Sequence, residues 1–394
     1  MEKLKYALIG LGQRGNTLWD GAIMNIKTVE CVAVCDVNAA KCEKFAKHLE
    51  ENGFPRPEIY YDYKECLDKA NVSAVIVAAS WEAHVSVALY SMEKGIPVGV
   101  EVGGAYSVES LWSLVKCYEK TKTPVMMLEN CCFGRKELLA LNMKRKGLLG
   151  EIVYAEGGYC HDLRDEILGG TTYRLQEYIH RNAENYPTHE IGPIAKILDI
   201  GTGNRFTSLQ SFGTKSVGLE ARVKQKNMEN LYGVKFNQSD VVTTIIKCQN
   251  GEMVNITLDT SLPRYYSRKF CIHGTKGIIN EENSSVLLDG MLTKECWDWS
   301  SNYNNITEFY EKYDHPLWVG YTPHGGHGGM DWLCTNAFFD AVRDKKPMPV
   351  DVYDMACWMV ITVLSEQSLS TGTAIAFPDF TEGKWITRKN EFML

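Results

Sequence analysis

Short, continuously apolar runs alternate with amphipathic stretches over the first 130 residues of the chain. Continuous hydrophobicity is typical of strands that are covered on both faces, as in a parallel sheet. The stretch from Ala83 to Lys94 has helical periodicity and ends at Gly95 with Pro97 beyond it, which is a helix stop. The alternation predicts a doubly wound α/β domain with right-handed crossovers. Its strands are expected at 6–9, 31–35, 74–79, 98–100 and 125–128, and its helices at 41–51, at 83–94 and from 107 onward.

The pattern changes from about residue 150 onward. The segments 241–246 and 253–259 are rich in β-branched residues and are joined by a turn at Asn250-Gly251, which is a hairpin signal. Further strands are expected at 269–273 and 277–280, and helices at 330–342 and 354–370. We therefore expect a second domain, over 131–394, of the α+β class with a large open mixed or antiparallel sheet.

Composition places the chain among ordinary globular proteins. It has 394 residues, of which 45% are hydrophobic and 23% charged, and a net charge of −7, so a nucleic-acid partner is not expected. No apolar run is long enough to span a membrane, and the first residues run straight into a strand without a leader, so a cytoplasmic protein is expected. The 13 cysteines are scattered and include no C-x-x-C pair, which favours reduced, buried thiols.

The loop Gly10-Leu11-Gly12-Gln13-Arg14-Gly15 follows the first predicted strand and precedes a helix. Glycines at this spacing allow a tight turn and a close approach of the backbone to a pyrophosphate at the helix N-terminus. Asp36 closes the second strand, 21 residues after Gly15, where an acid accepts hydrogen bonds from ribose hydroxyls and repels a 2′-phosphate. The pattern predicts a Rossmann domain over 1–130 that binds NAD rather than NADP, with an ordinary α/β turn as the alternative.

Several further motifs occur in order along the chain. They are WEAH at 81–84, EVGGA at 101–105, MLENCC at 127–132, GEIVYAEGGYCHDLR at 150–164, NYPTHEIGP at 185–193, PRYYSR at 263–268, GHGGMD at 326–331 and FPDFTEGKW at 377–385. With the Rossmann start and the β-rich second half, the chain resembles the Gfo/Idh/MocA oxidoreductases. Within that superfamily it resembles the NAD-dependent α-N-acetylgalactosaminidases of glycoside hydrolase family 109.

The sequence departs from these relatives at a few positions. Most members of the superfamily have Glu-Lys-Pro after the fifth strand, where the lysine assists hydride transfer, whereas this chain has Glu101-Val102-Gly103. The missing lysine argues against a simple dehydrogenase. Glu190 follows His189 where family 109 usually has glycine, and Tyr173 stands where we expect tryptophan, so the sugar, its anomer and its aglycone stay open.

The resemblance implies a redox-neutral hydrolysis. Ordinary glycosidases use two carboxylates that flank the glycosidic bond. Here NAD⁺ held by the protein would oxidise the sugar at C3, a base would remove the acidified C2 hydrogen, and the C1 leaving group would be eliminated. Water would then add at C1, and the hydride would return to C3. The cofactor supplies the difficult chemistry, and the protein supplies positioning and proton transfer.

The resemblance also implies which residues act. His189 is expected to transfer the C3 proton and to contact NAD, and Tyr186 to contact both sugar and cofactor. Tyr159 is a candidate C2 base and shares one strand face with His161, for which catalysis and a structural hydrogen bond are equally open. The remaining substrate contacts are expected at Arg174, Tyr266 and, with a surface salt bridge as the alternative, Arg181. The expected cofactor-binding residues are Gly10, Gly12, Gln13, Arg14, Gly15, Asp36, Trp81, His84, Glu101, Val102, Asn130 and His189.

Other functions remain open at this point. The main alternative is an NAD-dependent sugar or cyclitol dehydrogenase that releases NADH, and a non-catalytic NAD(H) sensor is a further one. His324 and His327 lack acid or cysteine partners at useful spacing, so no metal site is predicted and a glycine-rich loop is expected there. The expected partner is a small carbohydrate or glycoside. An exposed sheet face in the second domain favours a homo-oligomer, a dimer or tetramer, by resemblance.

Overall fold

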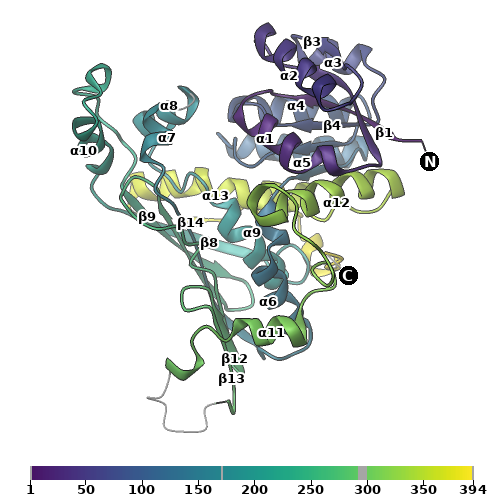
Figure 1. The fold of residues 1–394 in the computed structure, drawn as a ribbon. Coiled ribbons are helices and arrows are strands. Elements are labelled where there is room, and N and C mark those ends of the chain that lie inside the picture. The colour runs from purple at the N-terminus through teal and green to yellow at the C-terminus, as the bar shows by residue number, and fades with distance from the viewer. Residues whose placement is uncertain (1, 170–171, 292–299, 393–394) are drawn as a thin grey trace. The chain divides into compact units, whose positions relative to one another are not determined.

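The computed structural model describes residues 2–169, 172–291 and 300–392, which form two compact units (Figure 1). The first unit comprises Met1–Phe133, Tyr321–Val360 and Glu391–Leu394, and the second comprises Gly134–Gly320 and Ile361–Asn390. The predicted boundary at residue 130 lies near the first of these divisions. The prediction did not include the return of 321–360 to the first unit.

The first unit is built on a six-stranded parallel sheet with the strand order β3-β2-β1-β4-β5-β6. This is the order of a doubly wound dinucleotide-binding fold, as the sequence predicted. The residues of β4 are all buried, which explains why its sequence is continuously apolar. The strands are β1 (Leu4–Ile9), β2 (Val29–Cys35), β3 (Glu58–Tyr60), β4 (Ala74–Val77), β5 (Val98–Val100) and β6 (Val125–Met127).

Helices connect the parallel strands of the first unit. Ser107 caps the helix that begins at Val108, because its hydroxyl accepts a hydrogen bond from the Ser110 amide at 3.1 Å. The helices are α1 (Gln13–Gly21), α2 (Ala39–Glu51), α3 (Tyr63–Lys69), α4 (Trp81–Glu93), α5 (Val108–Thr121) and α12 (Met330–Asp344), with short 3₁₀ turns η1 (Ile23–Asn25), η2 (Asn130–Phe133) and η5 (Gly326–Gly329).

Aromatic packing explains why α12 belongs to the first unit although it lies 200 residues beyond β6 in the chain. The Phe339 ring lies 5.2 Å from the ring of Tyr6 on β1. Phe338 packs near Gly99 on β5, since an added Cβ there would lie 3.4 Å from its ring, at ordinary contact distance. Both phenylalanines are almost completely buried, so α12 completes the core of this unit.

The second unit is built on an eight-stranded sheet with the order β13-β12-β11-β7-β10-β9-β8-β14. The sheet is mixed, as predicted, because β10 pairs with β7 in parallel and the other neighbours pair antiparallel. The predicted hairpin is confirmed as β9 and β10, joined at Asn250-Gly251. The strands are β7 (Ile152–Cys160), β8 (Phe206–Gly213), β9 (Val241–Cys248), β10 (Met253–Asp259), β11 (Cys271–Gly274), β12 (Gly277–Asn280), β13 (Ser285–Leu288) and β14 (Ile375–Ala376).

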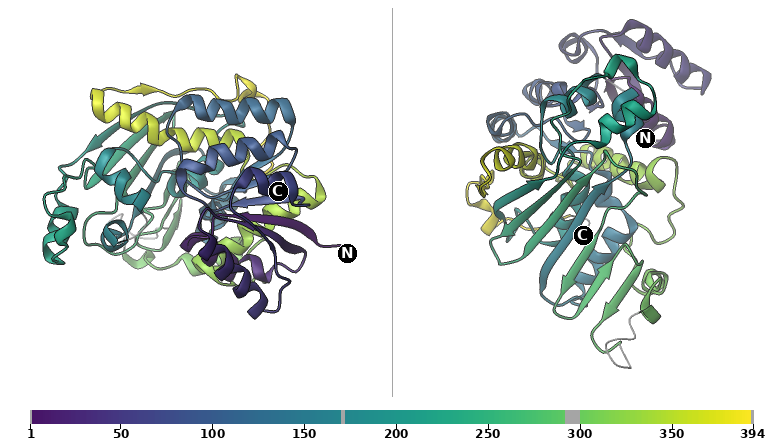
Figure 2. Two further views of the ribbon diagram at one scale, coloured as in Figure 1. Left: turned by 90° about the horizontal axis from the view of Figure 1, so that it is seen from above. Right: turned by 90° about the vertical axis from the view of Figure 1, so that its left-hand side faces the viewer.

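Helices cover one face of this sheet, and the other face is open (Figure 2, right). Gly157 on β7 lets α9 approach closely, because an added Cβ there would lie 3.0 Å from the Glu190 Cβ. The open face carries half-buried and exposed side chains, among them Phe212 and Met253. The helices are α6 (Arg135–Arg145), α7 (Arg164–Gly169), α8 (Thr172–His180), α9 (Thr188–Ile197), α10 (Gly218–Gln225) and α11 (Ile306–Tyr313), with 3₁₀ turns η3 (Glu229–Leu231), η4 (Ser300–Asn302) and η6 (Lys384–Ile386). The helix α13 (Val352–Thr371) begins in residues of the first unit and ends in residues of the second.

Two properties of the whole chain complete the description. The cysteines in the described ranges are free thiols, and most of them are buried. Among the described helices, none combines the length and the apolar character that crossing a membrane requires.

Candidate active site

The glycine loop between β1 and α1 has the shape of a phosphate cradle. Gly10 has φ of +94°, and a Cβ there would lie 2.4 Å from the Ala79 amide nitrogen. A Cβ on Gly15 would lie 2.1 Å from the Gly10 carbonyl oxygen. Gly12, by contrast, precedes the first turn of α1 and faces open space, since a Cβ there would meet no described heavy atom within 4 Å. The loop is therefore tight on the protein side and open at Gly12, where a pyrophosphate can approach the helix N-terminus.

Asp36 lies at the end of β2, next to this loop. Its carboxylate accepts hydrogen bonds from the Leu11 and Asn38 amides, both at 2.9 Å. These bonds fix the carboxylate beside the glycine loop, while Val37 next to it is 92% exposed and offers an apolar surface. A fixed acid beside an open cradle fits the ribose and pyrophosphate of NAD, and its charge opposes a 2′-phosphate.

Arg14 lies at the centre of a charged network within the first unit. Its Nε donates to Glu101 Oε1 at 2.9 Å, and its two terminal nitrogens donate to the oxygens of Asp331 at 2.9 and 3.0 Å. The contact with Asp331 is bidentate, which is the strongest form of an arginine–carboxylate pair. The network joins the glycine loop, the end of β5 and the first turn of α12.

Asp331, which we did not predict as a site residue, receives four hydrogen bonds in all. Besides Arg14, Asn130 donates to it at 2.6 Å and His327 Nδ1 lies 2.8 Å from it. The side chain is 1% exposed, and burial alone would raise its pKa. The hydrogen bonds from His327 and Arg14 outweigh burial and hold the pKa of Asp331 well below its usual range.

His327 protrudes from a loop that only glycines permit. Gly325, Gly328 and Gly329 all have positive φ, and a Cβ on Gly325 would lie 2.0 Å from the Gly21 carbonyl oxygen. His327 itself is left-handed, with φ of 50°, and its side chain is 54% exposed. Because an ionised Asp331 can only accept, His327 Nδ1 carries the proton and Nε2 is left as the acceptor. This is the geometry of a histidine oriented for proton transfer.

The other predicted cofactor residues of the first unit shape the ends of β4 and β5. Trp81 begins α4, and its ring lies against Gly103, where a Cβ would be 2.5 Å from the indole nitrogen. His84 is buried, and its ring nitrogens lie 3.1 Å from the carbonyl oxygens of Gly103 and Ala79. His84 thus ties the loops after β4 and β5 together, and burial lowers its pKa. Val102, in the place of the superfamily lysine, is buried.

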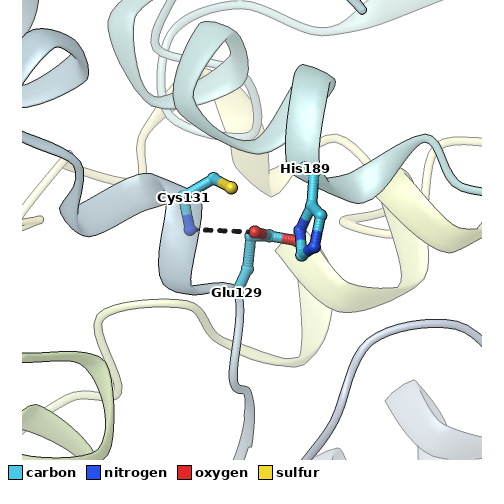
Figure 3. Close-up of side chains that lie close together, drawn as sticks. All are labelled: Glu129, Cys131 and His189. Atoms are coloured by element: carbon cyan, nitrogen blue, oxygen red, sulfur yellow. Dashed lines mark hydrogen bonds between the residues drawn. The ribbon is translucent and has the colours of Figure 1, made fainter. Parts of the chain in front are cut away.

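The segment after β6 adds a further buried carboxyl to the first unit. The Glu129 carboxylate accepts a hydrogen bond from the Cys131 amide at 3.0 Å (Figure 3). This bond fixes the start of η2, from which Asn130 reaches Asp331. Glu129 belongs to the motif MLENCC at 127–132 but was not predicted as a site residue.

In the second unit, four predicted residues form one ring cluster. Tyr159 and Tyr186 stack with centroids 4.4 Å apart, and His189 lies edge-on to them at 5.4 and 5.0 Å. His161 follows the end of β7 and stacks on Tyr159 at 6.1 Å, so the two share a face as predicted. The helix α9 begins at Thr188, so His189 extends from its first turn (Figure 3).

Two more predicted residues border this cluster. The Arg174 guanidinium lies 5.7 Å from the Tyr186 ring centroid and forms an ion pair with Glu166 at 2.9 Å. Tyr266, which is 53% exposed, lies edge-on to His161 at 5.2 Å. Burial raises the pKa of Tyr159 well above its ordinary value, although His189 and Arg174 oppose the shift. Tyr159 is therefore a neutral phenol at neutral pH.

Arg181 makes contacts of another kind. It forms ion pairs with Glu177 at 3.2 Å and with Glu366 at 2.7 Å. These are the contacts that the salt-bridge alternative describes, and a substrate role for Arg181 stays a prediction.

Comparison with known proteins assigns both halves of the chain. The family described as "Oxidoreductase family, NAD-binding Rossmann fold" matches residues 4–129, and the family described as "Glycosyl hydrolase 109, C-terminal domain" matches residues 133–387. An alpha-N-acetylgalactosaminidase of Tannerella forsythia is 39% identical over 99% of this chain and 89% of its own length. A glycosyl hydrolase family 109 protein of Parabacteroides distasonis is 38% identical over 100% of this chain and 90% of its own length.

Solved structures share the fold at low identity. The myo-inositol 2-dehydrogenase of Lactobacillus plantarum superposes with a TM-score of 0.69 at 15% identity, covering 96% of this chain and 100% of that one. The WlbA dehydrogenase of Bordetella pertussis, solved with NADH and UDP-GlcNAcA, superposes with a TM-score of 0.70 at 13% identity, covering 96% and 98%. These likenesses extend over both units of the chain and concern its fold.

Proposed function

Because the chain belongs to glycoside hydrolase family 109, an enzyme family with an NAD-binding Rossmann domain, we propose that it hydrolyses α-N-acetylgalactosaminides by a redox-neutral route. When bound, NAD supplies a hydride acceptor and donor for the C3 position of the sugar. The observation that carries the proposal is the Tyr159–Tyr186–His189 ring cluster in the domain that matches family 109. A sugar or cyclitol dehydrogenase is less well supported, because buried Val102 replaces the superfamily lysine.

We propose that the first unit holds NAD through its open cradle. The amides around Gly12 at the start of α1 bind the pyrophosphate, and Asp36 accepts hydrogen bonds from the adenosine ribose. Arg14, fixed by Glu101 and Asp331, adds a positive charge beside this site. A direct contact of His84 with the cofactor stays a prediction, since both its nitrogens already lie against backbone carbonyls.

The second unit is proposed to bind the sugar and to move protons. His189 lies within the ring cluster and transfers the C3 hydroxyl proton, because an imidazole titrates near neutrality. Tyr186 and Arg174 contact the sugar from one side of the cluster, and Tyr266 from the other.

The assignment of the C2 base shifts from Tyr159 toward His161. Because burial raises its pKa, the Tyr159 phenol stays protonated at neutral pH and cannot take up the C2 proton. Tyr159 is therefore better suited to donate a hydrogen bond to the sugar. His161 Nδ1 is buried and meets no hydrogen-bond partner among the described residues. A buried imidazole nitrogen of this kind needs a partner, and a polar group of the bound sugar or a water would supply it.

His327 is a further candidate for proton transfer, on the side of the first unit. Asp331 fixes its tautomer and orientation, and the glycine loop leaves its ring half exposed. A carboxylate that orients a histidine in this way holds it in one tautomer, with Nε2 as the atom that can accept a proton. We therefore add His327 to the residues proposed for catalysis.

The assembly and the compartment stay predictions. The open face of the eight-stranded sheet exposes Phe212 and Met253, and we propose that a second copy of the chain covers it. Sedimentation of the purified protein tests this, since a monomer at micromolar concentration would contradict it. We also propose a cytoplasmic location, as expected from the sequence.

The test of the proposed function uses the purified protein without added cofactor. Aryl α- and β-glycosides, including N-acetylgalactosaminides, are supplied in large excess over enzyme, and aglycone release is followed together with NADH absorbance. We expect many turnovers per enzyme with no growing NADH signal. Stoichiometric NADH formation without bond cleavage would favour the dehydrogenase instead.

A further inference from the structure

Two buried carboxyl groups lie beneath the ring cluster of the second unit. Glu184 precedes α9 and is 0% exposed, and Glu190 lies in the first turn of α9 and is 2% exposed. Each carboxyl group acts on the pKa of the other, and three of their four oxygens are buried and meet no hydrogen-bond partner among the described residues. Glu190 directly follows His189, and Glu184 lies two residues before Tyr186, so the pair brackets two residues of the ring cluster in the chain.

The surroundings of Glu184 and Glu190 are almost entirely neutral. Glu190 Oε2 accepts a hydrogen bond from the Thr257 amide on β10 at 3.2 Å. The backbone amides of Tyr186 and Leu258 lie beside the Glu184 carboxyl, and the Glu184 amide donates to Ser365 Oγ at 2.7 Å. In the described part of the chain, however, neither Glu184 oxygen meets a donor in good hydrogen-bond geometry.

Two ionised carboxylates cannot satisfy each other, because each oxygen only accepts. A proton on one of them creates the missing donor and removes one of two buried like charges. Burial raises the pKa of Glu184 to about 8, and burial together with the charge of Glu184 raises the pKa of Glu190. At neutral pH the folded protein therefore keeps a proton on this pair of carboxyl groups.

We propose that Glu184 and Glu190 share one proton and that this shared proton positions Tyr186 and His189, setting the upper pH limit of the reaction. Tyr186 follows Glu184 by two residues and its amide lies beside the Glu184 carboxyl, whereas His189 directly precedes Glu190. Loss of the shared proton places two negative charges in contact under the ring cluster. The repulsion separates the carboxyl groups and with them the backbone that carries Tyr186 and His189.

Other titratable groups also face Glu184 and Glu190, but they do not account for the expected pH limit. Cys160 on β7 faces Glu190, and Tyr178 on α8 faces Glu184. Burial raises the pKa of each to about 12, so both stay neutral where the pair titrates. His189 on α9 is the remaining neighbour, and its charge favours the ionised form of Glu190.

The first test measures stability and does not need turnover. A carboxyl whose pKa is raised in the folded protein stabilises it fully below the unfolded value near 4.5, and that stability is lost as the pH rises toward about 8. Glu190→Gln keeps a donor beside Glu184 and removes the second ionisation. Its melting temperature relative to wild type is therefore expected to rise steadily from pH 5 to pH 8, as is that of Glu184→Gln.

Glu311→Gln is the matched control, because Glu311 is an exposed carboxyl on α11 of the same unit. Its melting temperature relative to wild type should not change over that pH range. If the melting temperatures of Glu190→Gln and Glu184→Gln relative to wild type also stay constant from pH 5 to pH 8, the shared proton does not exist. A variant that fails to fold is replaced in the series by the other one.

The second test concerns the reaction and rests on the proposed function. The alkaline limb of the kcat/KM profile is expected to move up by about one pH unit or more in Glu190→Gln, since the second ionisation is absent. An unchanged limb would overturn the positioning role, even if the stability test succeeds. Absence of turnover in the wild type at every pH would count against the proposed function, while the stability series would still decide on the shared proton.

Discussion

Asp331 in the first unit and the Glu184–Glu190 pair in the second unit are similarly buried, but Asp331 is fully ionised whereas the pair keeps one proton. Arg14, Asn130 and His327 surround Asp331 with donors, so its pKa is lowered and it stays ionised. The pair is surrounded by neutral groups and by each other, so their pKa values are raised and a proton remains. Burial alone therefore does not decide the charge of a carboxyl; the neighbours that replace water decide it.

The difference also matches the tasks proposed for the two units. A permanent charge network holds Arg14 and His327 in one orientation, which suits a site that keeps its cofactor bound. A carboxyl pair that shares a proton supports residues that themselves gain and lose protons. The predictions below test whether the two settings differ as described.

The largest effect is expected from His189→Ala in the ring cluster. Removal of a general base lowers kcat by roughly 10²–10⁴-fold. The cradle of the first unit is left intact, so the NAD content of the purified protein should equal that of wild type. Loss of NAD together with activity would mean that His189 serves mainly to bind the cofactor.

A smaller effect is expected from Asp331→Asn, which should weaken the binding of NAD. The change leaves Arg14 with Glu101 alone and removes the charge that orients His327, so NAD affinity should fall by about 10–100-fold. Equilibrium dialysis with NAD measures this directly. Asp344→Asn at the other end of α12 is the control, since its ion pairs are at the surface. Equal affinities in the two variants would show that the network is not needed for the cofactor.

Two glycines of the cradle separate folding from cofactor binding. Gly15→Ala would place a Cβ 2.1 Å from the Gly10 carbonyl, so the first unit should lose about 1–3 kcal/mol of stability. Gly12→Ala meets open space and should keep wild-type stability while weakening NAD binding. Thermal melting without NAD and NAD titration distinguish the two. A destabilised Gly12→Ala protein would contradict the open cradle.

The smallest effect is expected from Arg181→Ala. The change breaks an ion pair with Glu177, which is buried, and one with Glu366, whose side chain is partly exposed, so the cost should be about 1 kcal/mol. kcat and KM should stay at their wild-type values. A rise in KM with unchanged stability would instead restore the substrate role that the sequence left open.

Local sequence patterns predicted most of the fold. The apolar runs predicted the parallel sheet, the Asn250-Gly251 turn predicted the hairpin, and the resemblance named the residues of the ring cluster. The patterns could not show that 321–360 returns to the first unit, because that depends on packing such as Phe339 against Tyr6. Arg14 and Asp331 are 317 residues apart, and no local signal connects them. Glu190 was noticed only as a departure, since its partner and its burial are properties of the folded chain.

The central claim is that the bound NAD is regenerated within each hydrolysis. Hydrolysis of an aryl α-N-acetylgalactosaminide in D₂O, followed by NMR of the released sugar, tests it most directly. If C2 loses its hydrogen during elimination and the hydride returns to C3, the product carries deuterium at C2 and keeps the original hydrogen at C3. A product without deuterium at C2 would contradict the account, because it would mean that the bond is cleaved by direct displacement.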